Sequence, residues 1–392
     1  MRRLSTVARA ELRRAEVDGS ISSSSFGWQA FVKPSIQTLV QLTPIAIAAV
    51  VAFFPPSPAT VERFYARGVY PALQAQLTSL SNRAALSLFD LTLAVVVLAV
   101  IAGWIYSLRR LRRERSLWPI ARGAFATLAA AAVVYLWFLA AWGLNYARPP
   151  LETVMAYDAS RVTPFAVRLL AEHAVREANR THTAAHAAGF PGIHDRPPAL
   201  IDALHQVERE LGRPRSTSVA QPKTSWLSPF FRASGVSGML APFYMETLLN
   251  PDLTGPERPS VLAHEWAHLS GYAPESDASF VGYLAALRAG PAAEYSVWLD
   301  LVSEAANQLQ PVTQRLVLEK LDAGPRRDQQ AIRERLKALV QPVERAAWST
   351  YDQLLKSQGV EEGVRSYSRV IQLLIGTDVL KVPSPKPQAP RQ

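Results

Sequence analysis

Two histidines, with a glutamate directly after the first, stand in the run His264-Glu265-Trp266-Ala267-His268. This is the HExxH pattern of zinc hydrolases. On a helix, positions i and i+4 share a face, so both imidazoles can bind one Zn²⁺. Glu265, about 100° further round the helix axis, would contact the metal-bound water as a general base. Zinc lowers the pKa of such a water to about 7, so the pattern predicts a hydrolase with Glu265 as its catalytic residue.

A third protein ligand is expected, because a catalytic zinc site uses three and leaves one position open. Glu275 follows a predicted turn at 271–274 and begins a second predicted helix at 275–287. If that helix folds back, His264, His268 and Glu275 form a two-His, one-Glu zinc site. Two alternatives stay open: Asp277 is a rival ligand, and Glu275 is also suited to stabilising the helix start. With Glu275 as ligand, Asp277 or Ser279 is placed to hydrogen-bond the far nitrogen of a ligating histidine.

Helix signals surround the motif. Pro256, Pro259 and Ser260 predict the start of its helix, and Gly271 stands where a glycine commonly ends one. The competing interpretation is an ordinary amphipathic helix that matches HExxH by chance. The flanking signals favour the metal site.

The first 150 residues contain three apolar runs, at 36–54, 91–108 and 123–144, that carry no Lys, Arg, Asp or Glu. Each is long enough to cross roughly 30 Å of hydrocarbon as a helix. They are too numerous and too long for a signal peptide. Three transmembrane helices are therefore predicted in a membrane anchor at 36–145, with buried helices of a soluble domain as the alternative.

Arginine placement predicts the orientation. Six arginines crowd the connection between the second and third runs: Arg109, Arg110, Arg112, Arg113, Arg115 and Arg122. By the positive-inside rule this connection and the 1–35 segment are cytoplasmic, which places 146–380 outside. The net charge of +10 then reflects topology and contact with lipid headgroups, and no nucleic-acid motif accompanies it.

Residues 151–380 are expected to be mostly helical. Apolar residues recur at helical spacing in 163–188, 197–212, 292–308, 328–340, 343–357 and 360–375. The stretch 216–250 is different, because 235–240 reads as a short strand just before the motif helix. Such an edge is a candidate to pair with a peptide substrate, and a plain structural hairpin is the alternative. The proline-rich tail 381–392 is predicted to be disordered.

The remaining histidines lack an HExxH-like context and are predicted to be surface or hydrogen-bonded side chains: His173, His182, His186, His194 and His205. The chain has no cysteine. Absence of cysteine fits an extracytoplasmic compartment.

Five separated segments carry a further resemblance. They are 64–71 (FYARGVYP), 142–151 (WGLNYARPPL), 235–239 (GVSGM), 264–273 (HEWAHLSGYA) and 363–367 (GVRSY). Together, over about residues 36–378, they resemble the bacterial membrane family called domain of unknown function 3810. The resemblance implies a multi-span anchor followed by a zincin-like domain of uncharacterised activity. The family's pattern after the glycine is E-x-E-A-N, whereas this chain has Glu275-Ser276-Asp277-Ala278-Ser279, which keeps the first glutamate.

The expected fold class is mainly α: three N-terminal transmembrane helices, then a mostly helical zincin-like metallopeptidase domain with a short β edge. The expected function is zinc-dependent hydrolysis of an amide bond in an envelope protein or peptide, at the bacterial inner membrane. Tyr367 and Arg365 are candidate donors to the oxyanion. A non-catalytic sensor or scaffold with a structural or vestigial metal site is the alternative. A transporter is disfavoured because the predicted spans lack ionisable residues.

Overall fold

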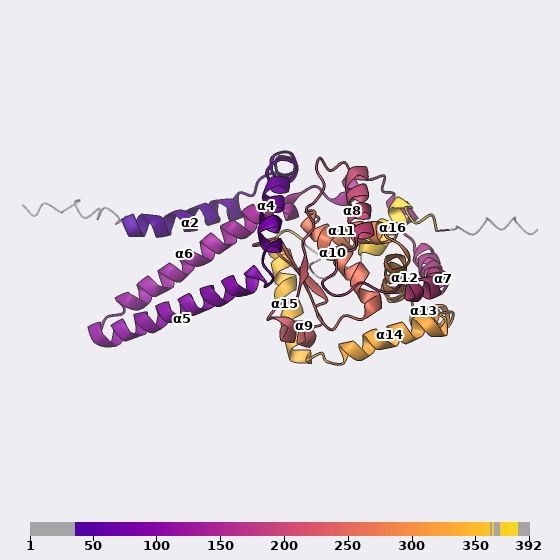
Figure 1. The fold of residues 1–392 in the computed structure, drawn as a ribbon. Coiled ribbons are helices and arrows are strands. Elements are labelled where there is room, and N and C mark those ends of the chain that lie inside the picture. Colours follow the sequence, from indigo (N-terminus) through magenta and orange to yellow (C-terminus); the bar gives the residue numbers. More distant parts are fainter. Residues whose placement is uncertain (1–35, 361–362, 364–368, 383–392) are drawn as a thin grey trace, which may run out of the picture. The chain divides into compact units, whose positions relative to one another are not determined.

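The computed structural model describes residues 36–360, 363 and 369–382. Its contacts divide the chain into two units, Met1–Thr43 and Pro44–Gln392. Helix α2 (Ile36–Phe53) begins in the first unit, and all that follows concerns the second. The second unit is mostly helical with one small sheet (Figure 1), which confirms the mainly α prediction.

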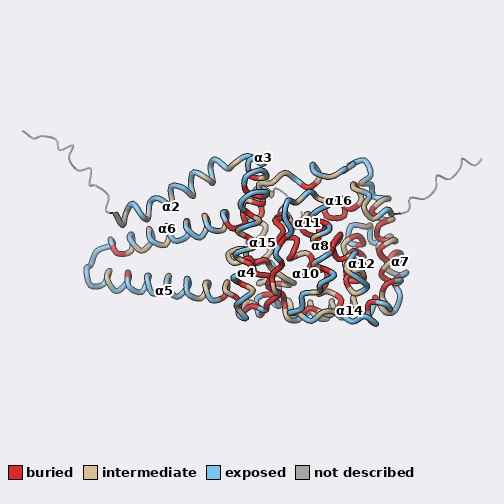
Figure 2. The backbone as a smooth tube through the Cα atoms, turned by 45° about the horizontal axis from the view of Figure 1, so that its top comes forward, coloured by how far each residue is buried: buried red, intermediate tan, exposed pale blue. Residues whose placement is uncertain are grey.

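Among the described residues, two helices are long and apolar enough to cross a membrane, α5 (Leu88–Glu114) and α6 (Trp118–Ala141). A third span is present if the bent pair Leu39–Phe53 and Pro58–Asn82 counts as one. Most residues along α5 and α6 are exposed, as the pale blue tube in Figure 2 shows. Apolar side chains on all faces of a long exposed helix need a lipid environment, so these helices indicate a membrane protein.

The apolar runs are slightly displaced from the helices that contain them. The predicted span 91–108 lies inside α5. The predicted span 123–144 ends too late, because α6 stops at Ala141 and a 3₁₀ turn, η2 (Gly143–Ala147), follows. Gly123 lets the two helices approach closely, since a Cβ there would lie 2.7 Å from Ser107 Oγ.

Between α2 and α5 the chain forms α3 (Pro58–Thr60), the π-helix η1 (Val61–Val69) and α4 (Tyr70–Asn82). Short 3₁₀ turns η3 (Leu151–Thr153) and η4 (Ala159–Arg161) follow η2. The later helices are α7 (Pro164–Ala188), α8 (Pro198–Glu210), α9 (Ser228–Ser234), α10 (Arg258–Leu269), α11 (Glu275–Ala286), α12 (Pro291–Ala306), α13 (Pro311–Leu318), α14 (Ala323–Leu336), α15 (Gln341–Ser357) and α16 (Arg369–Thr377). The 3₁₀ turn η5 (Gly255–Glu257) precedes α10.

Most predicted helices occur close to their expected limits. Helix α14 begins five residues before the predicted 328, and α9 and α13 were not predicted, nor were η1 and α4, which lie between the first two predicted spans. The predicted helix 360–375 falls partly outside the described residues, which resume with α16. The predicted tail lies outside them from residue 383 onward.

The sheet has three short strands, β1 (Pro222–Lys223), β2 (Gly238–Ala241) and β3 (Glu246–Leu249), in the order β1-β3-β2. Strand β3 pairs parallel to β1 and antiparallel to β2, with Leu240 opposite Thr247. The short strand expected at 235–240 is thus present, three residues later, as one arm of a hairpin. Strand β2 is an edge of the sheet.

A buried carboxylate joins the sheet to the first membrane helix. Glu246 on β3 accepts hydrogen bonds from the backbone N–H groups of Leu88 (3.0 Å) and Phe89 (2.8 Å), at the start of α5. Its Oε1 also lies 2.7 Å from Nζ of buried Lys223 on β1. A helix N-terminus leaves N–H groups without partners and favours a negative charge, so Glu246 satisfies both needs at once.

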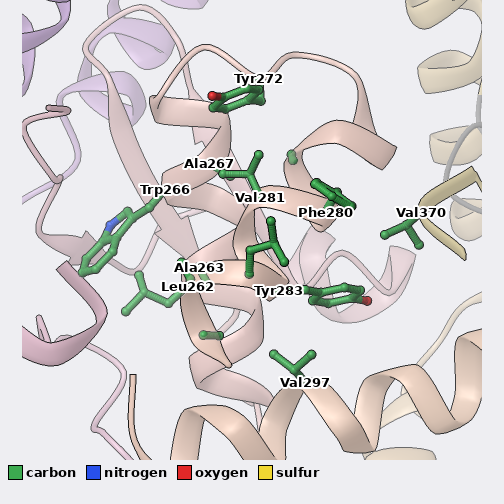
Figure 3. Close-up of a cluster of buried hydrophobic side chains, with 14 of the residues drawn as sticks. Leu262, Ala263, Trp266, Ala267, Tyr272, Phe280, Val281, Tyr283, Val297 and Val370 are labelled. Carbon is green, nitrogen blue, oxygen red and sulfur yellow. The ribbon is translucent and has the colours of Figure 1, made fainter. Parts of the chain in front are cut away.

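Helices α10 and α11 lie at the centre of the core. Figure 3 shows their apolar side chains packed together, with Val297 of α12 and Val370 of α16 beside them. The fully buried indole of Trp266 donates a hydrogen bond to the carbonyl of Ala220 at 3.1 Å. Gly282 permits the contact between the two helices, because a Cβ there would lie 2.9 Å from the backbone nitrogen of His264. The motif helix is therefore held rigidly from several sides.

Candidate metal centre

The structure brings His264, His268 and Glu275 together. Oε2 of Glu275 lies 3.1 Å from Nε2 of His264 and 3.3 Å from Nε2 of His268. The ligand atoms of the three residues lie within 4.8 Å of one another. In a tetrahedral zinc site with bonds of 2.0–2.1 Å, ligand atoms are about 3.4 Å apart. The spacing observed here suits that geometry.

A tight turn between α10 and α11 produces this arrangement. Gly271 adopts φ +83°, a conformation that ends helices and favours glycine. The backbone N–H of Tyr272 then bonds back to the carbonyl of Ala267 at 3.2 Å. Helix α11 begins at Glu275 and runs back along α10, so its first side chain faces the two imidazoles.

Hydrogen bonds orient both imidazoles. Nδ1 of His268 lies 2.8 Å from the carbonyl oxygen of Tyr272, which can only accept, so Nδ1 carries a hydrogen and Nε2 is the nitrogen left to bind a metal. Nδ1 of His264 lies 3.1 Å from Oγ of Ser279. Ser279 thus occupies one of the two positions expected for a group behind a ligand. Asp277 does not.

Asp277 lies on a different surface from the imidazoles. It lines a cavity of about 380 Å³ together with Arg148, Arg213 and Arg369. Burial raises the pKa of Asp277 to about 6, and Arg369 opposes that rise. The structure therefore places Glu275, and not its rival, beside the two histidines.

Tyrosines hold the Glu275 carboxylate from the other side. The hydroxyl of Tyr351, on α15, donates to Oε1 of Glu275. Tyr146 is next to both residues and is hydrogen-bonded to Tyr351. Burial, followed by the charge of Glu275, raises the pKa of the Tyr146 phenol. Tyr351 was missed from the sequence because nothing in α15 resembles a motif. Tyr367 and Arg365, the predicted donors, lie outside the described residues.

Glu265 is buried between α10 and the edge strand β2. A Cβ on Gly238 would lie 2.6 Å from its Oε1, so only glycine fits there. The backbone N–H of Leu240 bonds to the Glu265 carboxylate. Burial raises the pKa of Glu265, although the neighbouring His264 and His268 oppose the rise. A carboxyl whose pKa moves toward neutrality is suited to accepting and returning a proton.

The donor set of the centre fits a cation. Oε2 of Glu265 is buried and makes no hydrogen bond within the described part of the chain. Nε2 of His264 and Nε2 of His268 both face Oε2 of Glu275, and because lone pairs on nitrogen and oxygen repel each other, a proton or a metal ion must lie between them. Burial would raise the pKa of Glu275, but His268 and His264 outweigh it and hold that pKa well below its usual value.

Residues from the membrane-proximal segment bind the end of the motif helix. The last carbonyls of a helix lack intrahelical partners. The Tyr70 hydroxyl donates to the carbonyl of Leu269 at 2.8 Å, and the Trp142 indole donates to that of His268 at 2.9 Å. Arg148 donates to the carbonyl of Gly271 at 2.7 Å. The segment WGLNYARPP is therefore part of the wall of the centre.

The other histidines have separate surroundings. His173 packs edge-on against Trp298, His194 contacts the carbonyl of Pro222 and His205 that of Thr217, as predicted for hydrogen-bonded or packed side chains. His182 and His186 lie together beside Asp328, and the hydrogen bond of His186 to this carboxylate also fits the prediction.

Comparison with known proteins identifies a family. No curated protein and no solved structure matches the chain. The family described as "Protein of unknown function (DUF3810)" matches residues 65–375, which include the membrane hairpin, the sheet and the centre. The chain belongs to this family.

Proposed function

We propose that the protein is a membrane-anchored zinc metallopeptidase that hydrolyses an amide bond of an envelope protein or peptide. One observation carries the proposal: the ligand atoms of His264, His268 and Glu275 lie within 4.8 Å of one another. The carboxylate of Glu265 is buried on α10, the helix of both histidines, one residue after His264. Three ligands and a separate base are what a catalytic zinc site needs, whereas a structural site closes its fourth position and needs no base.

Each residue has a role in this proposal. His264, His268 and Glu275 would hold Zn²⁺, which when bound acts as a Lewis acid on a carbonyl and makes water a stronger acid. Glu265 accepts a proton from the attacking water and passes it to the leaving amine. Tyr351 fixes the orientation of Glu275 through its hydrogen bond. Ser279 does the same for His264.

The edge of β2 supports a peptide as substrate. Strand β3 pairs with one edge of β2, and no described strand pairs with the other edge. Gly238 and Leu240 bring this strand directly to the Glu265 carboxylate. An extended peptide can add to such an edge through backbone hydrogen bonds, which would present its amide to the base.

The membrane hairpin supports an extracytoplasmic site. Helix α5 starts beside the sheet, at Leu88, and its other end carries Arg109, Arg110, Arg112 and Arg113. Helix α6 returns to the centre, where Trp142 bonds to His268. If the hairpin spans the inner membrane, the arginine-rich end is cytoplasmic and the centre lies outside.

The direct test uses the full-length chain purified in detergent. We expect His264→Ala to lose the zinc of this centre and hydrolysis together. Glu265→Gln should keep zinc and thermal stability while hydrolysis of envelope-derived peptides falls about 10² to 10⁴ fold, because only the proton acceptor is lost. Equal hydrolysis by wild type and Glu265→Gln would reject Glu265 as the base, and no hydrolysis by zinc-loaded wild type would reject the peptidase in favour of the sensor or scaffold.

A further inference from the structure

A second group of metal-ligand side chains lies outside the HExxH centre, between α7 and α14. His182 and His186 are four residues apart on α7, so they share one face of that helix. Asp328 projects toward them from α14. The ligand atoms of these three residues also lie within 4.8 Å of one another.

Distances between the atoms suit a single ion. Nε2 of His186 lies 2.8 Å from Oδ2 of Asp328, and Nε2 of His182 lies 3.6 Å from the same oxygen. The two imidazole rings have centroids 4.3 Å apart. Ligands of a tetrahedral zinc ion are about 3.4 Å apart, so small side-chain shifts would place all three atoms on one ion.

Neighbouring residues hold the group in this arrangement. The Tyr295 hydroxyl, on α12, donates to Oδ2 of Asp328 at 2.5 Å, as residues behind a metal ligand commonly do. A Cβ on Gly324, at the start of α14, would lie 2.5 Å from Cε1 of His182. The absence of that side chain allows α14 to approach the imidazole. Three helices thus contribute to a preformed cluster.

We propose that His182, His186 and Asp328 bind a second Zn²⁺ ion, which joins α14 to α7. Two imidazole nitrogens with a single carboxylate favour zinc and related transition metals over Mg²⁺ or Ca²⁺, which prefer sets of oxygen ligands. His186 has a half-exposed side chain, so the fourth position opens to solvent.

The second ion would help to position Tyr351, which is hydrogen-bonded to Glu275 of the first centre. Helix α14 leads through residues 337–340 to α15, which carries Tyr351 and its hydrogen bond to Glu275. Fixing α14 to α7 restrains the segment that positions this tyrosine. The proposed role of the second ion is therefore to link α14 to α7.

Metal analysis of the full-length protein in detergent tests the proposal. We expect two zinc equivalents in wild type, one in His186→Ala and in Asp328→Asn, and none in the double variant His186→Ala with His264→Ala. His173→Ala is the matched control, since it removes an imidazole from the same helix without touching Asp328, and should keep two equivalents.

The two proposals fail in different ways. If His186→Ala contains as much zinc as wild type, the second site is overturned. If His186→Ala lowers the zinc content and His264→Ala does not, the second site is supported and the first is rejected.

Thermal unfolding gives a readout that does not depend on how the His186→Ala variant folds. Adding Zn²⁺ to metal-stripped His264→Ala protein should raise its Tm, because an ion bound only by the folded state stabilises it. No rise in Tm at saturating Zn²⁺ would overturn the proposal.

Discussion

The indole of Trp142 both donates a hydrogen bond to the carbonyl oxygen of His268, at 2.9 Å, and packs edge-on against the imidazole of the same residue, with ring centroids 5.9 Å apart. Trp142 immediately follows α6, the second membrane helix, and is buried. The end of the membrane hairpin and the second histidine of HExxH are therefore in direct contact. The hairpin of α5 and α6 and the candidate metal centre are therefore packed together.

Replacing Trp142 with phenylalanine tests this contact. Trp142→Phe keeps an aromatic ring but removes the indole donor to the carbonyl of His268, which still accepts from the backbone N–H of Gly271, so the expected cost is that of one hydrogen bond, about 0.5–1.5 kcal/mol. We expect a lower Tm and weaker zinc binding in titrations with a competing chelator. Trp118→Phe, at an exposed indole at the start of α6, should change neither. Equal zinc affinity in both variants would show that the contact does not support the centre.

Tyr351 is expected to tune the affinity of the centre for metal. Tyr351→Phe removes one hydroxyl that donates to Glu275, and loss of such a partner typically weakens metal binding by about 10 to 100 fold. Thr350→Ala is the control on the same helix, since its hydroxyl bonds only within α15. Chelator competition measures both. An unchanged affinity in Tyr351→Phe would remove this tyrosine from the centre.

The sequence predicts what is encoded locally. Periodicity and caps locate α7, α8, α10 and α12. The i, i+4 spacing predicts that His264 and His268 share one helix face, and Gly271 predicts that the next helix folds back. Tyr351 is 76 residues beyond its partner Glu275 and is placed by tertiary packing, which no local pattern records. His182 and His186 do show helical ligand spacing, but Asp328 comes from another helix, so the group exists only in the folded chain.

Buried polar residues are the other feature that the sequence conceals. Glu246 lies in an otherwise ordinary stretch, yet in the fold it has no exposed surface and bonds to the start of α5. Trp142 lies in the apolar run 123–144, which was predicted to cross the membrane, whereas it is buried against His268. In both cases the partner lies more than a hundred residues away.

Topology can be measured with reporter fusions. Alkaline phosphatase joined after residue 160 should be active and a fusion near Arg113 inactive, because the arginine-rich connection is expected to stay in the cytoplasm. A cytoplasmic reporter should give the opposite activities at the two positions. Phosphatase activity near Arg113 with none after residue 160 would reverse the orientation.

Breaking the junction at Glu246 should destabilise the whole protein. Glu246→Gln removes the charge that faces Lys223 and leaves a buried ammonium without its counter-ion, which typically costs about 3–5 kcal/mol. We expect a clear fall in Tm in detergent. The control is Glu334→Gln, whose partner Lys337 is exposed, and this change should cost at most about 1 kcal/mol. Similar Tm values for the two variants would contradict a stabilising role for the junction.

Glu304 on α12 should make stability fall as pH rises through neutrality. Burial, and then the nearby Asp300 carboxylate, raises the pKa of Glu304 to about 7 from an ordinary value of 4.5. Between those two values the folded protein holds a proton that the unfolded chain has released, so the free energy of unfolding decreases with increasing pH. Glu304→Gln cannot lose a proton, and its stability should decline less between pH 5 and 8 than that of wild type. Urea unfolding at both pH values measures the difference, and parallel declines in the two proteins would show that Glu304 is not the group responsible.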